Sequence, residues 1–116
     1  MTPRFQADAD FNQKVVLGLR RRQPAMDFQD AHAGGVIGLP DSEVLAQAAG
    51  SGRILISHDR KTMPAHFAHF LAAKSSPGPI VVPQHLDIGA MIEDLLLIWA
   101  TSEAEEWRDR VVFLPL

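Results

Sequence analysis

Five acidic side chains occupy positions that suit divalent-metal chemistry. Asp8 and Asp10 follow a run typical of a first strand, Asp41 and Glu43 begin a predicted helix, and Asp59 follows a run of aliphatic residues. Magnesium and manganese prefer oxygen ligands, and a site that cleaves phosphodiesters holds one or two such ions between several carboxylates. We therefore predict Asp8, Asp41 and Asp59 as catalytic metal ligands, Asp10 as a further ligand, and Mg²⁺ or Mn²⁺ as the cofactor.

These carboxylates also have structural interpretations. Asp41 follows Pro40 at a helix start, where aspartate is a preferred N-cap. Asp59 can form an Asx-turn or pair with Arg60, and Asp10 can cap or face solvent at the start of a helix. Both interpretations stay open for Asp41, whereas the buried strand that precedes Asp59 favours a metal ligand there.

Three histidines lie near these carboxylates or share a helix. His58 directly precedes Asp59, but a histidine at a strand end is more often a hydrogen-bonded structural residue than a ligand. His66 and His69 are three residues apart on one predicted helix, which is compatible with metal binding. Because the sequence offers no third convergent ligand beside them, we expect surface imidazoles.

Basic residues flank the run that precedes Asp59. Arg53 begins this run, and Arg60 and Lys61 follow it. Since lysine and arginine bind phosphate groups, we predict that these three contact the backbone of a nucleic acid. The run at residues 20–22 is interpreted instead as a helix end whose arginines complement the helix dipole.

Composition restricts the class of protein. The chain has 116 residues, 47% hydrophobic residues and no cysteine, so we expect one domain over 1–116 and a metal held by oxygen or imidazole. A formal net charge of −3 argues against a general nucleic-acid coat protein. No apolar run approaches the length of a membrane span, and no signal peptide is expected before Arg4, so we predict a cytoplasmic protein.

Hydrophobic periodicity and turn residues predict an alternating order of strands and helices. Strands are predicted at residues 4–8, 26–30, 53–57, 79–82 and 111–114, and helices at 11–22, 41–49, 62–73 and 88–99. Asp87 is the predicted N-cap of the last long helix, and Ser102 with Glu105 has the spacing of a capping box for a short one. This order predicts an α/β fold with a mostly parallel sheet of about five strands and helices on both faces. Ligands of such sheets bind beyond the carboxyl ends of the strands.

Four segments resemble those of short bacterial PIN-like proteins, a family of unknown function suspected to include toxins of toxin–antitoxin pairs. They are residues 5–12 (FQADADFN), 38–45 (GLPDSEVL), 52–59 (GRILISHD) and 112–116 (VFLPL). The most specific part is the strand that ends in His58 and Asp59, preceded by the helix of Asp41. One departure is Ala9, which stands where many relatives have a second acidic residue.

The resemblance implies a three-layer, PIN-like (Rossmann-like) fold. It also implies Mg²⁺- or Mn²⁺-dependent endoribonuclease activity on single-stranded RNA, with Asp8, Asp41 and Asp59 in the active site and an antitoxin as partner. Two other functions stay open. One is a noncatalytic PIN-like module that acts through a partner or as a homodimer, and the other is a receiver domain with Asp59 as phosphoacceptor. Receivers carry a hydroxyl residue after the fourth strand and a lysine after the fifth, where this chain has Pro83-Gln84 and Pro115-Leu116.

Overall fold

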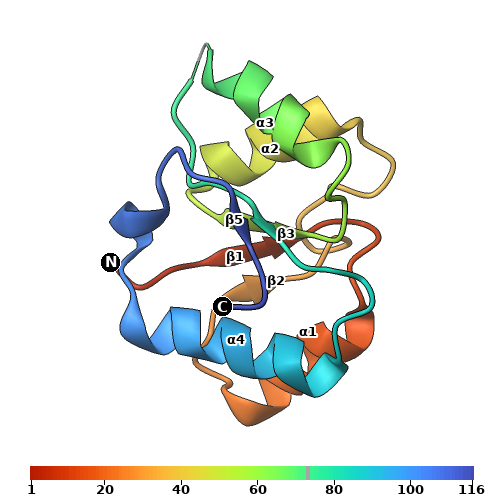
Figure 1. Ribbon diagram of the computed structural model, residues 1–116, viewed down its shortest axis with the longest axis vertical. Coiled ribbons are helices and arrows are strands. Elements are labelled where there is room, and N and C mark those ends of the chain that lie inside the picture. Colours follow the sequence, from red (N-terminus) through yellow and green to blue (C-terminus); the bar gives the residue numbers. More distant parts are fainter. Residues whose placement is uncertain (73) are drawn as a thin grey trace.

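The computed structural model describes residues 1–72 and 74–116, which form a parallel sheet between two layers of helices (Figure 1). The strands are β1 (Phe5–Ala7), β2 (Phe28–Gln29), β3 (Ile54–Ser57), β4 (Ile80–Val81) and β5 (Val112–Phe113). The helices are α1 (Gln13–Arg22), α2 (Asp41–Gly50), α3 (Met63–Leu71) and α4 (Ile88–Thr101), and a 3₁₀ helix (Ala104–Trp107) precedes β5. The order of the elements is the predicted one, although each strand is shorter than its predicted range.

The sheet has the strand order β2-β1-β3-β4-β5, and all neighbouring strands pair in parallel. The predicted α/β class is therefore confirmed, with a sheet that is wholly rather than mostly parallel. The chain moves outward from β1 to β2 and then returns to β3 on the other side of β1. This reversal places a topological switch point between β1 and β3, where doubly wound sheets bind their ligands.

The strands alternate between two apolar layers. Phe5 and Ala7 of β1 and Ile54 and Ile56 of β3 pack with α1 and α4, whereas Leu55 packs in the cluster formed with α2 and α3. Helices α1 and α4 thus cover one face of the sheet, and α2 and α3 cover the other (Figure 1). All four residues of β3 are buried, as expected for a central parallel strand.

Helix α4 buries the predicted apolar stripe. Met91 and Leu95 lie in the core, and the other predicted stripe residues pack against it: Ile88, Ile92, Leu96 and Trp99. Asp87 is the N-cap, as predicted, because its Oδ2 accepts a hydrogen bond from the backbone N–H of Ala90. Ile98, which was not part of the predicted stripe, is also buried.

Two helix starts differ from the sequence predictions. Pro40 is the N-cap of α2, so Asp41 lies inside the first turn and is not the cap. The capping box of the 3₁₀ helix joins Glu103 and Glu106, one residue beyond the predicted pair Ser102 and Glu105. The Ser102 hydroxyl instead donates to Ile98 at the end of α4 and is therefore engaged elsewhere. The predicted end of α3 near residue 73 lies outside the described residues.

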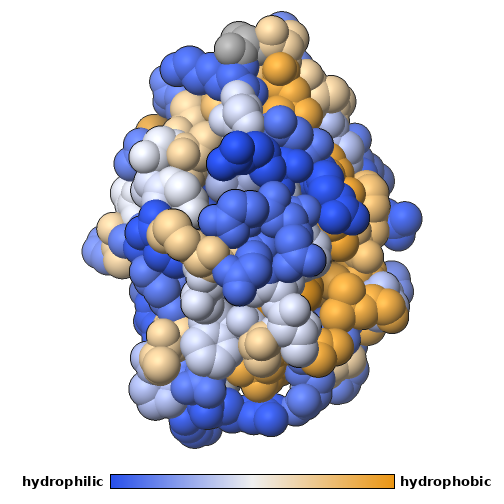
Figure 2. All heavy atoms as spheres, turned by 90° about the vertical axis from the view of Figure 1, so that its left-hand side faces the viewer, coloured by the Kyte–Doolittle hydropathy of each residue, from blue (hydrophilic) through white to orange (hydrophobic). Residues whose placement is uncertain are grey.

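The face that carries the N-terminus and the 3₁₀ helix has hydrophilic side chains at its centre (Figure 2). This side of the molecule is the amino edge of the sheet, where the strands begin. The opposite side, where they end, is the carboxyl edge. Across residues 1–72 and 74–116, no helix combines the length and apolar character needed to cross a bilayer.

Leu95→Ala tests the packing of α4 on the sheet. Leu95 is completely buried, so its truncation leaves a cavity and is expected to lower the free energy of unfolding by about 2–5 kcal/mol. Leu97→Ala on the same helix is the matched control, because Leu97 is 51% exposed and its loss changes stability by about 0.5 kcal/mol or less. Urea denaturation measures both. Equal losses for the two variants would contradict this packing.

Candidate functional site

Asp8 and Asp59 lie at the carboxyl edge, after two strands that are hydrogen-bonded neighbours. Asp8 directly follows β1, and its backbone N–H donates to the carbonyl of Ile56 in β3 at 2.9 Å. Asp59 follows β3 by two residues. The switch point between β1 and β3 thus carries an aspartate on each side, as the sequence predicted from the order of the elements.

Ser57, the last residue of β3, links these two segments. Its Oγ donates to Oδ2 of Asp8 at 2.9 Å and accepts the backbone N–H of Asp59 at 3.0 Å. Ser57 is almost completely buried, so both contacts replace hydrogen bonds to water. The sequence analysis missed this residue, although a hydroxyl that ends an otherwise aliphatic buried strand was a usable signal.

The Asp8 carboxyl has a raised pKa. Partial burial is the main cause, and the negative charges of Asp41 and Asp10 add to it. Hydrogen bonds from the Ser57 hydroxyl and the Ala9 N–H oppose the shift by stabilising the charged form. Asp41 and Asp10 therefore each lie close enough to Asp8 to repel its negative charge, and a cation bound at Asp8 would offset this repulsion.

Asp41 faces this cluster from the first turn of α2. Because Pro40 is the N-cap and no side chain caps this helix, the Asp41 carboxylate is not engaged at a cap. Its Oδ2 lies 3.5 Å from Nε2 of His66 on α3, and both side chains are partly exposed. The packing of α2 against α3 creates this contact. The sequence analysis placed His66 among surface imidazoles and did not associate it with Asp41.

The Asp59 carboxylate is directed into the turn before α3. Its Oδ1 accepts the backbone N–H groups of Lys61 and Thr62, and its Oδ2 accepts the Thr62 hydroxyl. Burial acts to raise the pKa of Asp59, but these hydrogen bonds outweigh it and hold the pKa below its ordinary value. Of the roughly four lone-pair positions of a carboxylate, Asp59 uses three in this turn, whereas Asp8 uses two.

His58 is held by hydrogen bonds on both ring nitrogens. Nδ1 lies 2.8 Å from the carbonyl of Val82, and Nε2 lies 3.3 Å from the backbone N–H of Asn12. A neutral ring with its proton on Nδ1 satisfies both contacts, since it donates to Val82 and accepts from Asn12. The ring also stacks on Phe11 with centroids 4.7 Å apart. These contacts fit the predicted structural role of His58. His69 is exposed on α3.

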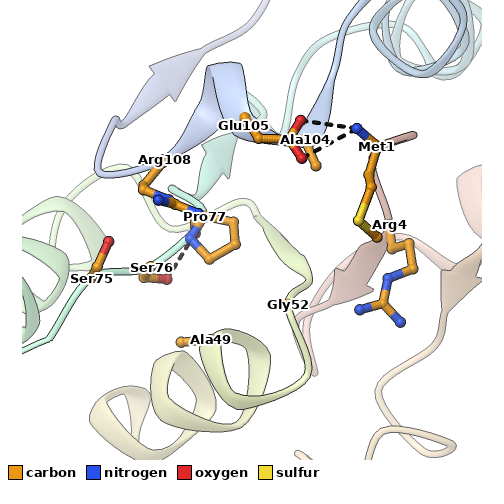
Figure 3. Close-up of a pocket in the computed structure, with 10 residues that line it drawn as sticks. All are labelled: Met1, Arg4, Ala49, Gly52, Ser75, Ser76, Pro77, Ala104, Glu105 and Arg108. Carbon is orange, nitrogen blue, oxygen red and sulfur yellow. Dashed lines mark hydrogen bonds and ion pairs between the residues drawn. The ribbon is translucent and has the colours of Figure 1, made fainter.

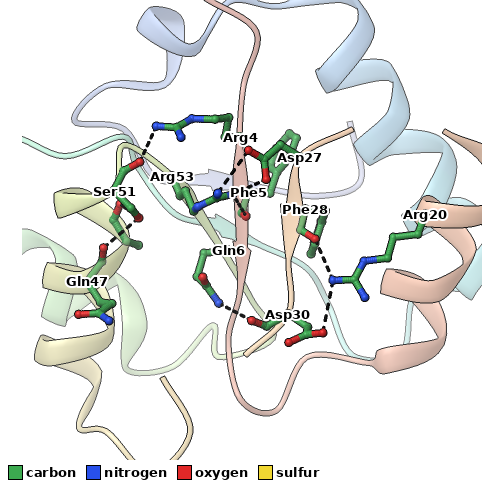
Figure 4. A network of polar contacts seen from close by, with 11 residues as sticks. Arg4, Phe5, Gln6, Arg20, Asp27, Phe28, Asp30, Gln47, Ser51 and Arg53 are labelled. Carbon is green, nitrogen blue, oxygen red and sulfur yellow. Dashed lines mark hydrogen bonds and ion pairs between the residues drawn. The ribbon is translucent and has the colours of Figure 1, made fainter. Parts of the chain in front are cut away.

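The three predicted phosphate-binding residues are divided between the two edges of the sheet. Arg60 and Lys61 are exposed in the loop after β3, at the carboxyl edge. Arg53 precedes β3 and lies at the amino edge, where it pairs with Asp27 at 2.7 Å and donates to the carbonyl of Phe5 at 3.1 Å (Figure 4). Its side chain is 12% exposed. The structure thus places Arg53 away from Asp8. Arg53 is close to Asp59 in sequence, but the two residues flank opposite ends of β3.

The carboxyl edge suits a hard cation through a small number of protein ligands. In the part of the chain that the structure describes, no three acidic or imidazole side chains converge tightly enough to form a complete metal cage. Mg²⁺ is commonly held by one or two carboxylates together with water and substrate phosphate. Asp8 and Asp41 are the two carboxylates of this edge that could serve in this way, and Asp10 is a third group whose charge acts on Asp8.

A cavity of about 470 Å³ lies at the other end of the molecule, on the amino edge (Figure 3). It is lined by residues that precede β1, β3, β4 and β5, among them Arg4, Gly52, Pro77 and Arg108. None of the predicted carboxylates lines it. Volume alone therefore does not identify the site, since the acidic groups gather at the opposite edge.

Asp8→Asn and Asp59→Asn are expected to change stability in opposite directions. The pKa of Asp8 is raised above 3.8, so the folded protein binds a proton that the unfolded chain releases, and stability falls as pH rises through that window. Asp8→Asn removes this loss of stability. Its single oxygen can still accept from Ser57, and the bond given up is the exposed one from Ala9, so we expect the variant to be equally or more stable at neutral pH. The pKa of Asp59 is lowered, so its contribution is present above 3.8 and is lost in acid. Asp59→Asn should cost about 1 kcal/mol at neutral pH.

Urea denaturation of both variants at about pH 3 and pH 7 measures these effects. The advantage of Asp8→Asn should shrink in acid, and so should the loss in Asp59→Asn. A destabilised Asp8→Asn at neutral pH would show that its carboxylate is a structural group.

Comparison with known proteins identifies no relative. No family model, no curated protein and no solved structure matches this chain. Function is therefore inferred from the geometry of the carboxyl edge.

Proposed function

We propose that this protein is a Mg²⁺- or Mn²⁺-dependent endoribonuclease of the PIN-like type. The observation that carries the proposal is the electrostatic interaction of Asp8 with Asp41 and with Asp10 at the switch point of the sheet, where burial and these two negative charges raise the pKa of Asp8. Such repulsion is relieved when a cation binds between the carboxylates. The resemblance of the sequence to PIN-like proteins supports the same activity, and a toxin controlled by an antitoxin is the biological role that it implies.

Asp8 and Asp41 are the proposed metal ligands. Each Asp8 oxygen accepts one hydrogen bond, from Ala9 or from Ser57, and each retains a lone pair that can face an ion. Asp41 has one contact with His66, and its carboxylate remains partly exposed. Asp59 is proposed to have a structural role and not to bind the metal. Its carboxylate accepts hydrogen bonds from the turn before α3, and these bonds stabilise the loop that contains Arg60 and Lys61.

The residues around the two proposed ligands have supporting roles. Ser57 fixes the orientation of the Asp8 carboxylate, and His66 lies beside Asp41. The exposed Arg60 and Lys61 are in position to attract the RNA backbone. When bound, the divalent ion lowers the pKa of a water molecule and offsets the charge that develops on the phosphate.

The noncatalytic module remains a second candidate because apolar side chains are exposed beside the edge strand. Phe113 of β5 and Leu97 of α4 are each 51% exposed, and Leu116 is 61% exposed. An edge strand with exposed apolar neighbours can pair with another chain. An absence of RNA cleavage, together with a dimer by light scattering, would favour this candidate.

The receiver interpretation has weaker support. The strand order is one that receiver domains also have. A phosphoacceptor aspartate needs an available oxygen to attack phosphorus, but Asp59 uses three of its roughly four lone-pair positions in the turn before α3, and only Oδ2 retains one.

RNA cleavage tests the proposed activity. The purified protein should cut single-stranded RNA in the presence of Mn²⁺, and cleavage should stop when a chelator is added. Asp8→Asn and Asp41→Asn should each reduce the rate by about 100-fold or more, the scale of losing a group that takes part in activating the nucleophile. Glu93→Gln is the matched control, because Glu93 lies on α4 and pairs with Arg22 at the surface. Cleavage that survives chelator, or that persists in both aspartate variants, would exclude this mechanism.

Metal binding is tested without knowledge of the substrate. At a hundredfold excess over its dissociation constant, Mn²⁺ should stabilise the unmutated protein by about 2.7 kcal/mol. Asp8→Asn should lose most of this effect, whereas Asp59→Asn should retain it because its carboxylate is engaged in the turn. Thermal melts with Mn²⁺ and with chelator measure the shifts. If Asp59→Asn loses the effect as Asp8→Asn does, Asp59 is a ligand as the sequence first predicted.

A further inference from the structure

A second cavity, of about 420 Å³, lies beside α2 on the face of the sheet opposite α1 and α4. Three glutamines line it, namely Gln6 of β1, Gln29 of β2 and Gln47 of α2, together with Gly34 and Ser51. All of the residues that line it are uncharged. Its volume is within the range of small-molecule sites. The cavity therefore offers neutral amide groups rather than charge.

Gln6 is the unusual member of this wall because it is a polar side chain within the sheet core. It is 1% exposed, and its Nε2 donates to the carbonyls of Ala7 at 2.9 Å and Asp30 at 3.1 Å (Figure 4). These two bonds fix the amide so that Oε1 points away from both carbonyls. Oε1 has no hydrogen-bond partner among the described residues.

This unpartnered oxygen is the part of Gln6 that reaches the cavity, although the residue as a whole is only 1% exposed. Within residues 1–72 and 74–116, every fully buried side-chain nitrogen or oxygen has a partner, so an unpartnered Oε1 of Gln6 must reach open space. Gln6 lines the cavity, which is the open space available to it. An acceptor in such a place stabilises a ligand that presents an N–H group, because leaving it unpaired is costly.

Gln47 adds a second acceptor on the facing helix. Its Nε2 donates to the carbonyl of Gly34 at 3.2 Å, which leaves its Oε1 for a ligand. Gly34 itself packs directly on the Gln6 amide, since a Cβ at this position would overlap Oε1 and Nε2 of Gln6. The backbone of residue 34 thus joins the two amides into one wall, and a side chain there would disturb it.

We propose that this cavity binds a nucleobase that carries an exocyclic amino group, as adenine does. A planar base with an amino edge supplies N–H donors to the acceptor oxygens of Gln6 and Gln47. An amide that reads adenine in DNA accepts from its amino group and donates to a ring nitrogen. Gln47 can do both, because only one of its Nε2 hydrogens is donated to Gly34. The proposal deepens and rests on the proposed function, since the base would belong to the RNA substrate. The cavity and the proposed metal site draw on the same two elements, β1 and α2, although none of the described residues lines both. β1 ends beside Asp8 and carries Gln6 two residues earlier, and α2 begins with Asp41 and carries Gln47.

Free nucleosides test the cavity apart from catalysis and apart from phosphate binding. Adenosine should shift the amide resonances of Gln6, Gly34 and Gln47 in ¹H–¹⁵N spectra of the whole protein. Purine riboside, which has hydrogen in place of the amino group, should bind at least tenfold more weakly, because a buried acceptor is then left unpaired. Equal affinities, or shifts confined to other surfaces, would overturn the proposal.

Variants locate the binding on the chain. Gln47→Leu and Gly34→Ala should each weaken adenosine binding at least tenfold, and Gln47 is exposed enough for its variant to fold. Gln13→Leu on α1 is the matched control, because this exposed glutamine lies on the other helical layer. Unchanged binding in Gln47→Leu would overturn the proposal. If adenosine binds as expected but RNA is not cut, the proposed nuclease activity fails and the base site stands. If RNA is cut and adenosine does not bind, the base site fails alone.

Discussion

The parallel pairing of β1 with β3 is the constraint on which the carboxyl edge depends. Ala7 pairs with Ile56, and the N–H of Asp8 extends the ladder by one more hydrogen bond. This register brings Asp8 within reach of the Ser57 hydroxyl and keeps Phe5 and Ala7 of β1 on the face covered by α1 and α4, together with Ile54 and Ile56 of β3. A slip of one residue would direct Gln6 into that core and turn Phe5 away from it. The hydrophobic alternation that selects the register therefore also positions the acidic groups.

The carboxyl edge carries an unfavourable arrangement of charge. A partly buried aspartate with two acidic neighbours is unfavourable in the absence of a cation, and its raised pKa expresses that cost. Two hydrogen bonds, from Ala9 and Ser57, offset part of it. The amino edge has the opposite character, because Arg53 is paired there with Asp27 and bound to a β1 carbonyl. At the amino edge the charge of Arg53 is thus paired, whereas at the carboxyl edge Asp8 is repelled by its acidic neighbours. Departures of this kind from local consistency are typical of functional sites, which is why the carboxyl edge is the candidate.

Sequence reasoning predicted the elements better than the side-chain contacts. The α4 stripe and the Asp87 cap follow from local spacing, which is why both are confirmed. The strands are shorter than predicted because apolar runs do not reveal where ladder hydrogen bonds stop. The contact between His66 and Asp41 depends on how α2 packs on α3, and local spacing carries no such information. Arg53 was predicted near the carboxylates because it is close to Asp59 in sequence. Closeness in sequence does not tell whether two residues lie at the same end of a strand, and Arg53 lies at the other end of β3.

The strand order also has a kinetic consequence. Gln6 meets Asp30 across 24 residues, so β1 and β2 can associate after a modest loop closes. Ser57 meets Asp8 across 49 residues, and β3 must insert on the free side of β1 before that contact exists. Chain closure over longer separations costs more entropy, and folds rich in such pairings fold more slowly. During synthesis one side of β1 thus remains unpaired until β3 has been made. The acidic edge can form only after residues 54–59 have been added to the chain.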